Sequence, residues 1–248
     1  MPNPFRRLAV RRPVTFPVGA LTPALLLCLL SFTSNLAIAQ SASTPPTAFE
    51  KQLNRIDLSV SAMGYLSTSV SGTNYTGVTF TQKPSNTVGE LGTLRYVGKP
   101  WVGFEFNFGN SRYTQNFITT HYTNSSVCPN SQCNYLLGGA QNNVHELTLG
   151  YVAHPPHTIF GLQPYLGAGG GTMQFRPTPG GGQGLPRQWR AVYFYDAGVD
   201  EYFPSAHFGF RAGFRQLIYL APDFGQNYLT ITRRTRTSEP NFGFFLRF

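Results

Sequence analysis

The feature that most constrains this chain is a stretch near its middle in which apolar and polar residues alternate strictly. In sequence order its residues are Val102, Gly103, Phe104, Glu105, Phe106, Asn107, Phe108 and Gly109. A helix would scatter these apolar side chains over all of its faces, whereas a β-strand places them on one face. The segment therefore predicts a strand with one apolar and one polar face.

The same alternation recurs in seven other segments of the chain. They cover about residues 55–67, 88–97, 143–153, 160–168, 189–203, 208–215 and 241–248. The connections alternate between long and short, and the long ones cover residues 68–87, 118–142, 176–187 and 221–237. Outer-membrane barrels have short turns at one rim and longer loops at the other. We therefore predict an all-β fold, an eight-stranded antiparallel up-and-down transmembrane β-barrel.

The composition agrees with a surface that faces lipid. Charged residues make up 12% of the chain and aromatic residues 15%, whereas soluble domains contain roughly 25% charged residues. The net charge of +9 raises the question of nucleic-acid binding. The basic residues form no stripe, and the start of the chain resembles an export signal, so we expect no nucleic-acid partner.

Residues 1–39 predict a cleaved signal peptide. An apolar stretch covers about residues 18–30, and Ala37 and Ala39 form a cleavage site before Gln40. The alternative, a membrane anchor, is disfavoured because a spanning helix needs about 20 apolar residues. Residues 40–54 are polar and predict a flexible lead-in, and residues 55–248 the barrel. The positive charge that precedes the apolar stretch comes from Arg6, Arg7, Arg11 and Arg12.

The charged residues of the strands fall mainly on the series opposite the apolar one. An outward base near the bilayer midplane would cost about 2–4 kcal/mol, so we expect these residues to face the interior. Two interpretations stay open, a salt-bridged plug that closes the barrel and a narrow pore lined by the same charges. Glycines on the inward series are expected to leave space for the arginines. The predicted interior charges are Asp57, Arg95, Glu105, Glu146, Asp196, Asp200, Arg211, Arg215 and Arg247.

The long predicted loops contain two candidate features. Cys128 and Cys133 predict a local disulfide, because an exported chain meets an oxidising compartment. Their spacing, without nearby histidine or acidic partners, is a poor metal site. Arg233, Arg234 and Arg236 form a candidate anion-binding loop for lipopolysaccharide phosphates, with a solvated loop as the alternative.

The histidines are the candidate catalytic residues of this sequence. Ser205 and His207 share one predicted turn, but no acid is available to orient the histidine. His145 and Glu146 are neighbours in sequence and point to opposite faces of a strand. We therefore expect no enzyme activity and no cofactor.

The chain resembles the small outer-membrane β-barrel proteins of the OmpA and OmpX type. The resemblance rests on the leader with Ala37-Ile38-Ala39, on Pro164–Gly171 and on the alternating ending Phe242–Phe248. It implies location in the bacterial outer membrane, among lipid and lipopolysaccharide. It also implies that Phe244, Leu246 and Phe248 form a signal read by the barrel-assembly machinery.

The resemblance is specific for fold and location and says little about function. We expect a non-catalytic protein with a structural or surface-interaction role carried by external loops, whose ligand the sequence does not identify. The alternatives are a narrow passive porin and a lipid A-modifying enzyme.

Overall fold

The chain forms a closed antiparallel barrel in the computed structural model, which describes residues 47–75, 77–99, 101–122, 132–205 and 207–248. Its strands are β1 (Ile56–Ser67), β2 (Val70–Thr73), β3 (Thr79–Pro84), β4 (Thr87–Lys99), β5 (Val102–Tyr122), β6 (Gln132–Ala153), β7 (Gln163–Pro177), β8 (Gln188–Ser205), β9 (Phe208–Leu220) and β10 (Arg234–Arg247).

Eight of these strands make the barrel wall. Neighbours pair in the order β1, β4, β5, β6, β7, β8, β9 and β10, and β10 returns to pair with β1. Every pairing in the wall is antiparallel. Because β10 pairs with β1, the circle is closed and the wall has no free edge strand. The predicted eight-stranded up-and-down barrel is confirmed.

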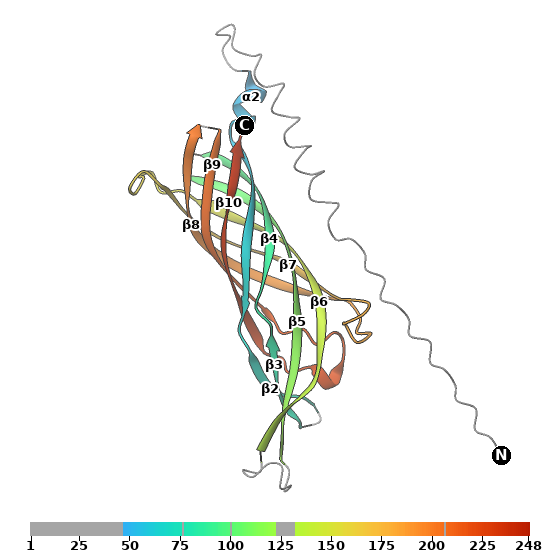
Figure 1. Cartoon of the computed structure of the whole chain (residues 1–248). Helices are drawn as coiled ribbons and strands as arrows, with labels where there is room; N and C mark the ends of the chain where they lie inside the picture. The colour runs from blue at the N-terminus through green and yellow to red at the C-terminus, as the bar shows by residue number, and fades with distance from the viewer. Residues whose placement is uncertain (1–46, 76, 100, 123–131, 206) are drawn as a thin grey trace, which may run out of the picture. The chain divides into compact units, whose positions relative to one another are not determined.

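The barrel has two different ends (Figure 1). The terminal end holds the start of β1, the end of β10 and the turns that follow β4, β6 and β8. The loop end holds the β2–β3 hairpin and the connections that follow β5, β7 and β9. The last of these connections includes the 3-10 helix η2 (Asn227–Leu229).

A short helix, α2 (Ala48–Leu53), lies in the segment predicted as a lead-in. Its first turn has a capping box: the Glu50 amide donates to the Thr47 hydroxyl at 3.2 Å, and the Thr47 amide donates to the Glu50 carboxylate at 2.7 Å. Within the part of the chain that the structure describes, no helix is long and apolar enough to span a membrane.

The prediction that residues 68–87 form a loop is wrong, because most of these residues lie in strands. β2 and β3 pair with each other and continue β1 and β4 beyond the wall. Hydroxyl pairs join the two strands, with 2.7 Å between Ser71 and Thr81 and 2.9 Å between Thr73 and Thr79. The outward face of the segment is polar and its inward face mixes Val70 and Phe80 with Gly72 and Gln82, so its sequence lacks the alternation that predicts a strand.

Two other loops are shorter than predicted for the same reason. β5 runs to Tyr122 and β6 begins at Gln132, within the predicted loop 118–142. β10 begins at Arg234, within the predicted loop 221–237.

The fifth strand was predicted to include Phe160 and Leu162, and the structure corrects this. Residues 159–162 form a tight turn in which Ile159 and Leu162 exchange backbone hydrogen bonds of 2.9 and 3.0 Å. Phe160 and Gly161 have φ angles of 53° and 84°, which is the left-handed pair that two-residue hairpin turns require. β7 starts only at Gln163, and Phe160 is fully exposed.

Candidate functional site

The candidate site is the filled interior of the barrel. In the half near the terminal end, ion pairs of two arginines link five strands. Arg95 of β4 donates to Glu105 of β5 at 3.0 Å and to Asp200 of β8 at 3.1 Å. Arg211 of β9 donates to the same Asp200 at 2.7 and 2.9 Å and to Asp57 of β1 at 3.1 Å. All five side chains are buried, so the network links opposite parts of the wall across the lumen.

A third arginine holds the middle of the interior. Arg215 of β9 pairs with Glu146 of β6 and lies 3.0 Å from Glu239 of β10. It also donates to the hydroxyl of Thr148 at 3.2 Å. Asp196 lies directly opposite Arg215 in the register of β8 and β9. Each of these guanidinium groups therefore has at least two buried acceptors, which makes its hydrogen bonds charge-assisted.

Aromatic rings pack against these guanidinium groups. The Arg95 guanidinium lies 4.3 Å from the Tyr165 ring centre, and the Arg211 guanidinium lies 5.7 Å from the same ring. Arg215 lies 5.0 Å from the ring of Phe194. Such contacts add cation–π attraction and fill space that water would otherwise occupy.

Aromatic rings occupy the space next to several of the inward glycines. A Cβ at Gly198 or at Gly213 would overlap the hydroxyl of Tyr165. A Cβ at Gly150 would overlap the ring of Phe194. These glycines therefore make room for the rings that support the arginines.

The half near the loop end has an apolar interior that the sequence did not indicate. Tyr65 lies at its centre, and its ring stacks on that of Tyr113 with 5.4 Å between ring centres. The Tyr65 hydroxyl lies 3.1 Å from the Tyr219 hydroxyl. We call this group the apolar cluster. Its members are Met63, Tyr65, Phe80, Leu91, Tyr113, Phe117, Ala140, Val144, Met173, Phe175, Val192, Phe194, Leu217, Tyr219, Ala221, Phe224, Leu229 and Ile231.

Of the nine predicted interior charges, the structure buries eight and leaves Arg247 28% exposed at the terminal end. Arg247 lies 3.5 Å from Asp57. Glu239 is a buried member of the network that the sequence reasoning missed. The alternation of the last strand continues inward through Asn241 to Glu239, but Pro240 and the preceding polar residues indicated a loop.

The other predicted site residues lie elsewhere. Arg233, Arg234 and Arg236 are exposed, and the last two lie on the outward face of β10 rather than in a loop. Ala37, Ala39, Gln40 and Cys128 lie outside the described residues, as does the side chain of Cys133. At the terminal end, Phe244, Leu246 and Phe248 point outward, and Phe244 stacks on Phe208 at 5.7 Å.

Of the residues considered for catalysis, His145 and Glu146 lie on opposite faces of the wall. Glu146 is buried in the lumen, whereas His145 lies on the outer wall against Phe108. The Nδ1 atom of His207 lies 3.0 Å from the Arg247 carbonyl oxygen, and the side chain of Ser205 lies outside the described residues. Residues 47–248, where described, contain no group of histidine, cysteine and acidic side chains arranged to hold a metal.

Comparisons with known proteins support the fold alone. No protein-family model matches the chain, and no curated protein matches it. Solved structures of small outer-membrane β-barrels are similar to it in fold. Neisserial surface protein A aligns with a TM-score of 0.46 and 13% identity, over 78% of this chain and 97% of that one.

The outer membrane protein OprG from Pseudomonas aeruginosa aligns with a TM-score of 0.46 and 11% identity, over 78% of this chain and 95% of that one. Ail, the attachment invasion locus protein of Yersinia pestis, was solved with the heparin analogue sucrose octasulfate. It aligns with a TM-score of 0.41 and 15% identity, over 78% of this chain and 99% of that one. The barrel assignment itself rests on the strand pairing of this chain.

Proposed function

We propose that this chain is an integral outer-membrane protein whose barrel is sealed and whose role is structural or surface-interacting rather than catalytic. The outward face supports the membrane assignment. Large apolar side chains such as Val60, Phe106, Leu149 and Phe244 are about half exposed. A soluble monomer rarely exposes a continuous apolar band of this kind, whereas a bilayer covers it.

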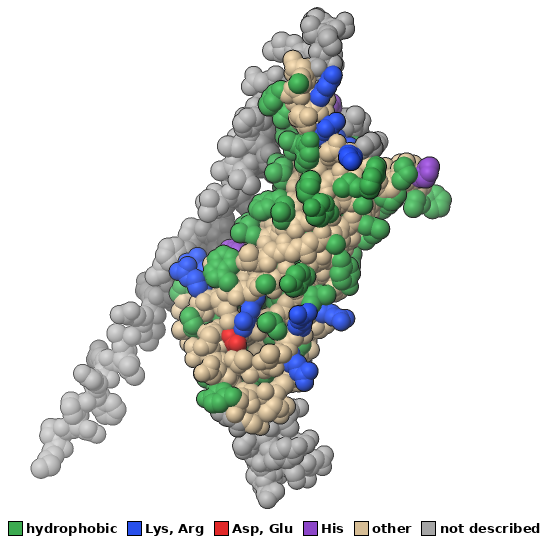
Figure 2. Space-filling view, turned by 180° about the vertical axis from the view of Figure 1, so that it is seen from behind, with side chains coloured by type: hydrophobic (Ala, Val, Ile, Leu, Met, Phe, Trp, Pro, Cys, Tyr) green, Lys and Arg blue, Asp and Glu red, His purple; other side chains and the backbone are tan. Residues whose placement is uncertain are grey.

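The orientation follows from the two ends of the barrel. Short turns of outer-membrane barrels face the periplasm and longer connections face outward, which would put the loop end at the cell surface. Lysine and arginine side chains form two groups in Figure 2, one at the top of the molecule and one over the lower part of the face. The exposed bases of the loop end, which suit contact with anionic lipid or a surface partner, are Lys83, Arg112, Arg176, Arg187, Arg233, Arg234 and Arg236.

The observation that carries the proposal is the double closure of the lumen. The ion-paired network of Arg95, Arg211 and Arg215 fills one half, and the apolar cluster around Tyr65 and Tyr219 fills the other. An eight-stranded barrel has an interior just wide enough for side chains. Both halves must open before ions can pass, which favours a closed barrel over a passive porin.

The test is the current through planar bilayers that contain the refolded chain from Gln40 onward. Folding is checked first by the shift in electrophoretic mobility between unheated and heated samples. We expect folded protein to give no stepwise current. Steady, ion-selective openings from folded protein would overturn the sealed barrel and support the porin alternative.

The lipid A-modifying alternative needs a separate measurement. We expect the mass spectrum of lipid A from cells that produce the protein to match that from cells without it. A new acylated or deacylated species would overturn the non-catalytic role.

A further inference from the structure

The outward face of β4–β7 changes from apolar to polar between two adjacent rows of side chains. The strand register aligns residues across the wall, so each row can be followed from one strand to the next. From the terminal end upward, the apolar rows are Tyr96–Phe104–Tyr151, Leu94–Phe106–Leu149 and Gly92–Phe108–Leu147. The next two rows are Glu90–Asn110–His145–Gln174 and Arg112–Asn143–Arg176.

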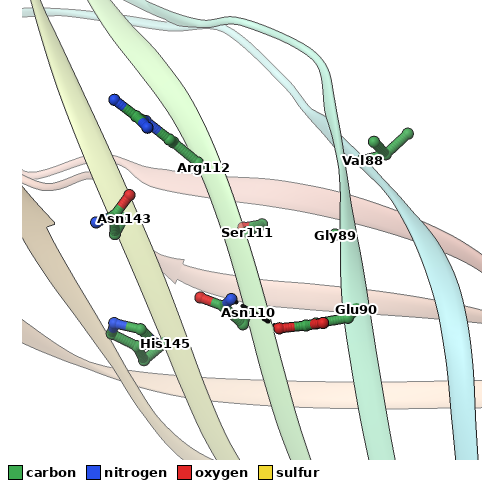
Figure 3. A pocket seen from close by; sticks show the side chains of 8 residues that line it. All are labelled: Val88, Gly89, Glu90, Asn110, Ser111, Arg112, Asn143 and His145. Atoms are coloured by element: carbon green, nitrogen blue, oxygen red, sulfur yellow. Dashed lines mark hydrogen bonds between the residues drawn. The ribbon is translucent and has the colours of Figure 1, made fainter. Parts of the chain in front are cut away.

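The two polar rows border a groove on the outside of the wall. It has a volume of about 530 Å³ and is lined from β4, β5 and β6 by Glu90, Asn110, Arg112, Asn143, His145 and the exposed Val88. Arg176 of β7 lies beside this lining, opposite Asn143. Figure 3 shows these side chains on three neighbouring strands, with the Asn110 amide donating to the Glu90 carboxylate at 2.9 Å. The groove therefore offers hydrogen-bond donors and acceptors on a face that is otherwise built for lipid.

The groove continues the apolar band without a break. His145 stacks on Phe108, with 6.4 Å between ring centres and 15° between planes, so the polar and apolar rows touch. An acyl chain that lies against Phe106, Phe108 and Leu147 would bring its headgroup to the level of the groove. This continuity indicates an amphiphile in the membrane rather than a soluble ligand.

The charges indicate which headgroup fits. Arg112 and Arg176 are exposed and flank Asn143 in one row. Arg112 donates to the Gln141 side chain at 2.6 Å, which uses only part of its five donors. Guanidinium groups bind phosphate through paired hydrogen bonds. The amides and the Glu90 carboxylate, which a phosphate does not need, suit the hydroxyl and amide groups of a sugar.

We propose that this groove binds the phosphorylated sugar headgroup of a glycolipid in the outer leaflet. Arg112 and Arg176 hold the phosphate, the side chains of the Glu90–Gln174 row contact the sugar, and the acyl chains lie on the apolar rows. The inference rests on the proposed function for the membrane orientation.

The experiment is native mass spectrometry of the refolded chain in detergent micelles with defined lipids. The probes are diphosphorylated lipid A, the same lipid without its phosphates, and phosphatidylglycerol, which has a phosphate but no sugar. The test variant is Arg112→Gln/Arg176→Gln. The control variant, Arg55→Gln/Lys99→Gln, removes two exposed charges of the terminal end that lie outside the two polar rows.

We expect the wild-type chain and the control variant to retain diphosphorylated lipid A. The test variant should bind it at least tenfold more weakly, a loss of about 1.4 kcal/mol or more, because it lacks the charge-assisted hydrogen bonds to the phosphate. Arg112→Lys/Arg176→Lys should give an intermediate affinity, since lysine keeps the charge and loses the planar pair of donors.

Three results would overturn the site. Equal loss in the test and control variants would indicate general charge attraction. Equal binding of the dephosphorylated lipid would exclude phosphate recognition, and equal binding of phosphatidylglycerol would exclude the sugar contacts. Failure of the proposed function is recognised separately, because the wild-type chain would then lack the heat-dependent mobility shift or would not insert into vesicles.

Discussion

Arg211 and Asp200 face each other across the pairing of β8 and β9 and form a two-pronged ion pair. The Nε atom of Arg211 donates to one carboxylate oxygen at 2.7 Å, and an Nη atom donates to the other at 2.9 Å. Arg211 also reaches Asp57 at 3.1 Å, and Arg95 reaches Asp200 from the other side. One buried guanidinium therefore contacts two carboxylates that lie on different strands.

Arg211→Ala should destabilise the barrel strongly. Removing one partner of a buried ion pair leaves uncompensated charge and costs about 3–5 kcal/mol. Arg247→Ala is the control, because Arg247 is partly exposed and lies 3.5 Å from Asp57. Urea unfolding in detergent, followed by tryptophan fluorescence, measures both. Equal stability losses in the two variants would contradict a central role for Arg211.

The two interior halves should act as seals in series. Tyr65→Ala/Tyr219→Ala opens the loop half only, so we expect no current from it in planar bilayers. Arg95→Ser/Arg211→Ser opens the terminal half only and should also be silent. The four changes combined should give measurable conductance in folded protein. Current from either double variant would show that one half alone closes the lumen.

A methyl group should be tolerated at one strand glycine and not at another. A Cβ at Gly171 would overlap the carbonyl oxygen of Leu147, whereas a Cβ at Gly92 would have its nearest neighbour, the Phe108 carbonyl oxygen, 3.9 Å away. We expect Gly171→Ala to lower the yield of folded barrel and its midpoint in urea by an amount typical of overpacking, about 1–3 kcal/mol. Gly92→Ala should leave both unchanged, and a matching loss there would refute the steric argument.

Asp223 should make the connection between β9 and β10 sensitive to acid. Partial burial raises the pKa of Asp223, but hydrogen bonds from Gln188, Gly225 and Thr230, with the charge of Arg190, outweigh it and lower the pKa. A lowered pKa means that the stabilisation is complete above the ordinary value of 3.8 and is lost as the pH falls below it.

Hydrogen exchange of the amides in residues 221–233, corrected for the intrinsic effect of pH, measures this loss. Exchange should speed up as the pH falls below the ordinary value. Asp223→Asn should exchange fast at every pH, because it cannot form the 2.8 Å ion pair with Arg190. A wild-type loop with no pH dependence would contradict the role of the carboxylate.

Phe248→Ala should reduce assembly in cells without reducing folding in detergent. The ending resembles the signal read by the barrel-assembly machinery, and Phe248 lies outward at the end of that signal. Phe242→Ala is the control, since Phe242 also points outward but lies further from the end of the chain. Equal outer-membrane levels of the two variants would argue against an assembly role for Phe248.

The sequence predicts strands well where one face meets lipid and the other meets the polar half of the interior. Val102–Phe108 is such a place, because the two faces differ sharply in polarity. The contrast disappears beyond the apolar band. Ser71 and Thr81 lie on strands whose outward face is polar, so the sequence of β2 and β3 resembles that of a loop.

The sequence does not indicate the apolar interior near the loop end, and the reason is the opposite one. Leu217 and Tyr219 point inward while Ile218 and Leu220 point outward, so both faces of β9 are apolar and the alternation disappears there. The nine predicted interior charges all lie in segments where apolar and polar residues alternate. Their pairing partners depend on which strands meet across the lumen, and no local pattern contains that information.

β5 and β6 continue as paired strands well beyond the apolar rows. The last apolar row includes Phe108, and the pairing of the two strands continues from Asn110 to Tyr122. Twelve residues at about 3.4 Å each make roughly 40 Å of paired strand, or about 30 Å of elevation at the usual tilt. The ends of the two strands, at Tyr122 and Gln132, therefore lie well beyond the apolar band, where a partner can approach them without contacting that band.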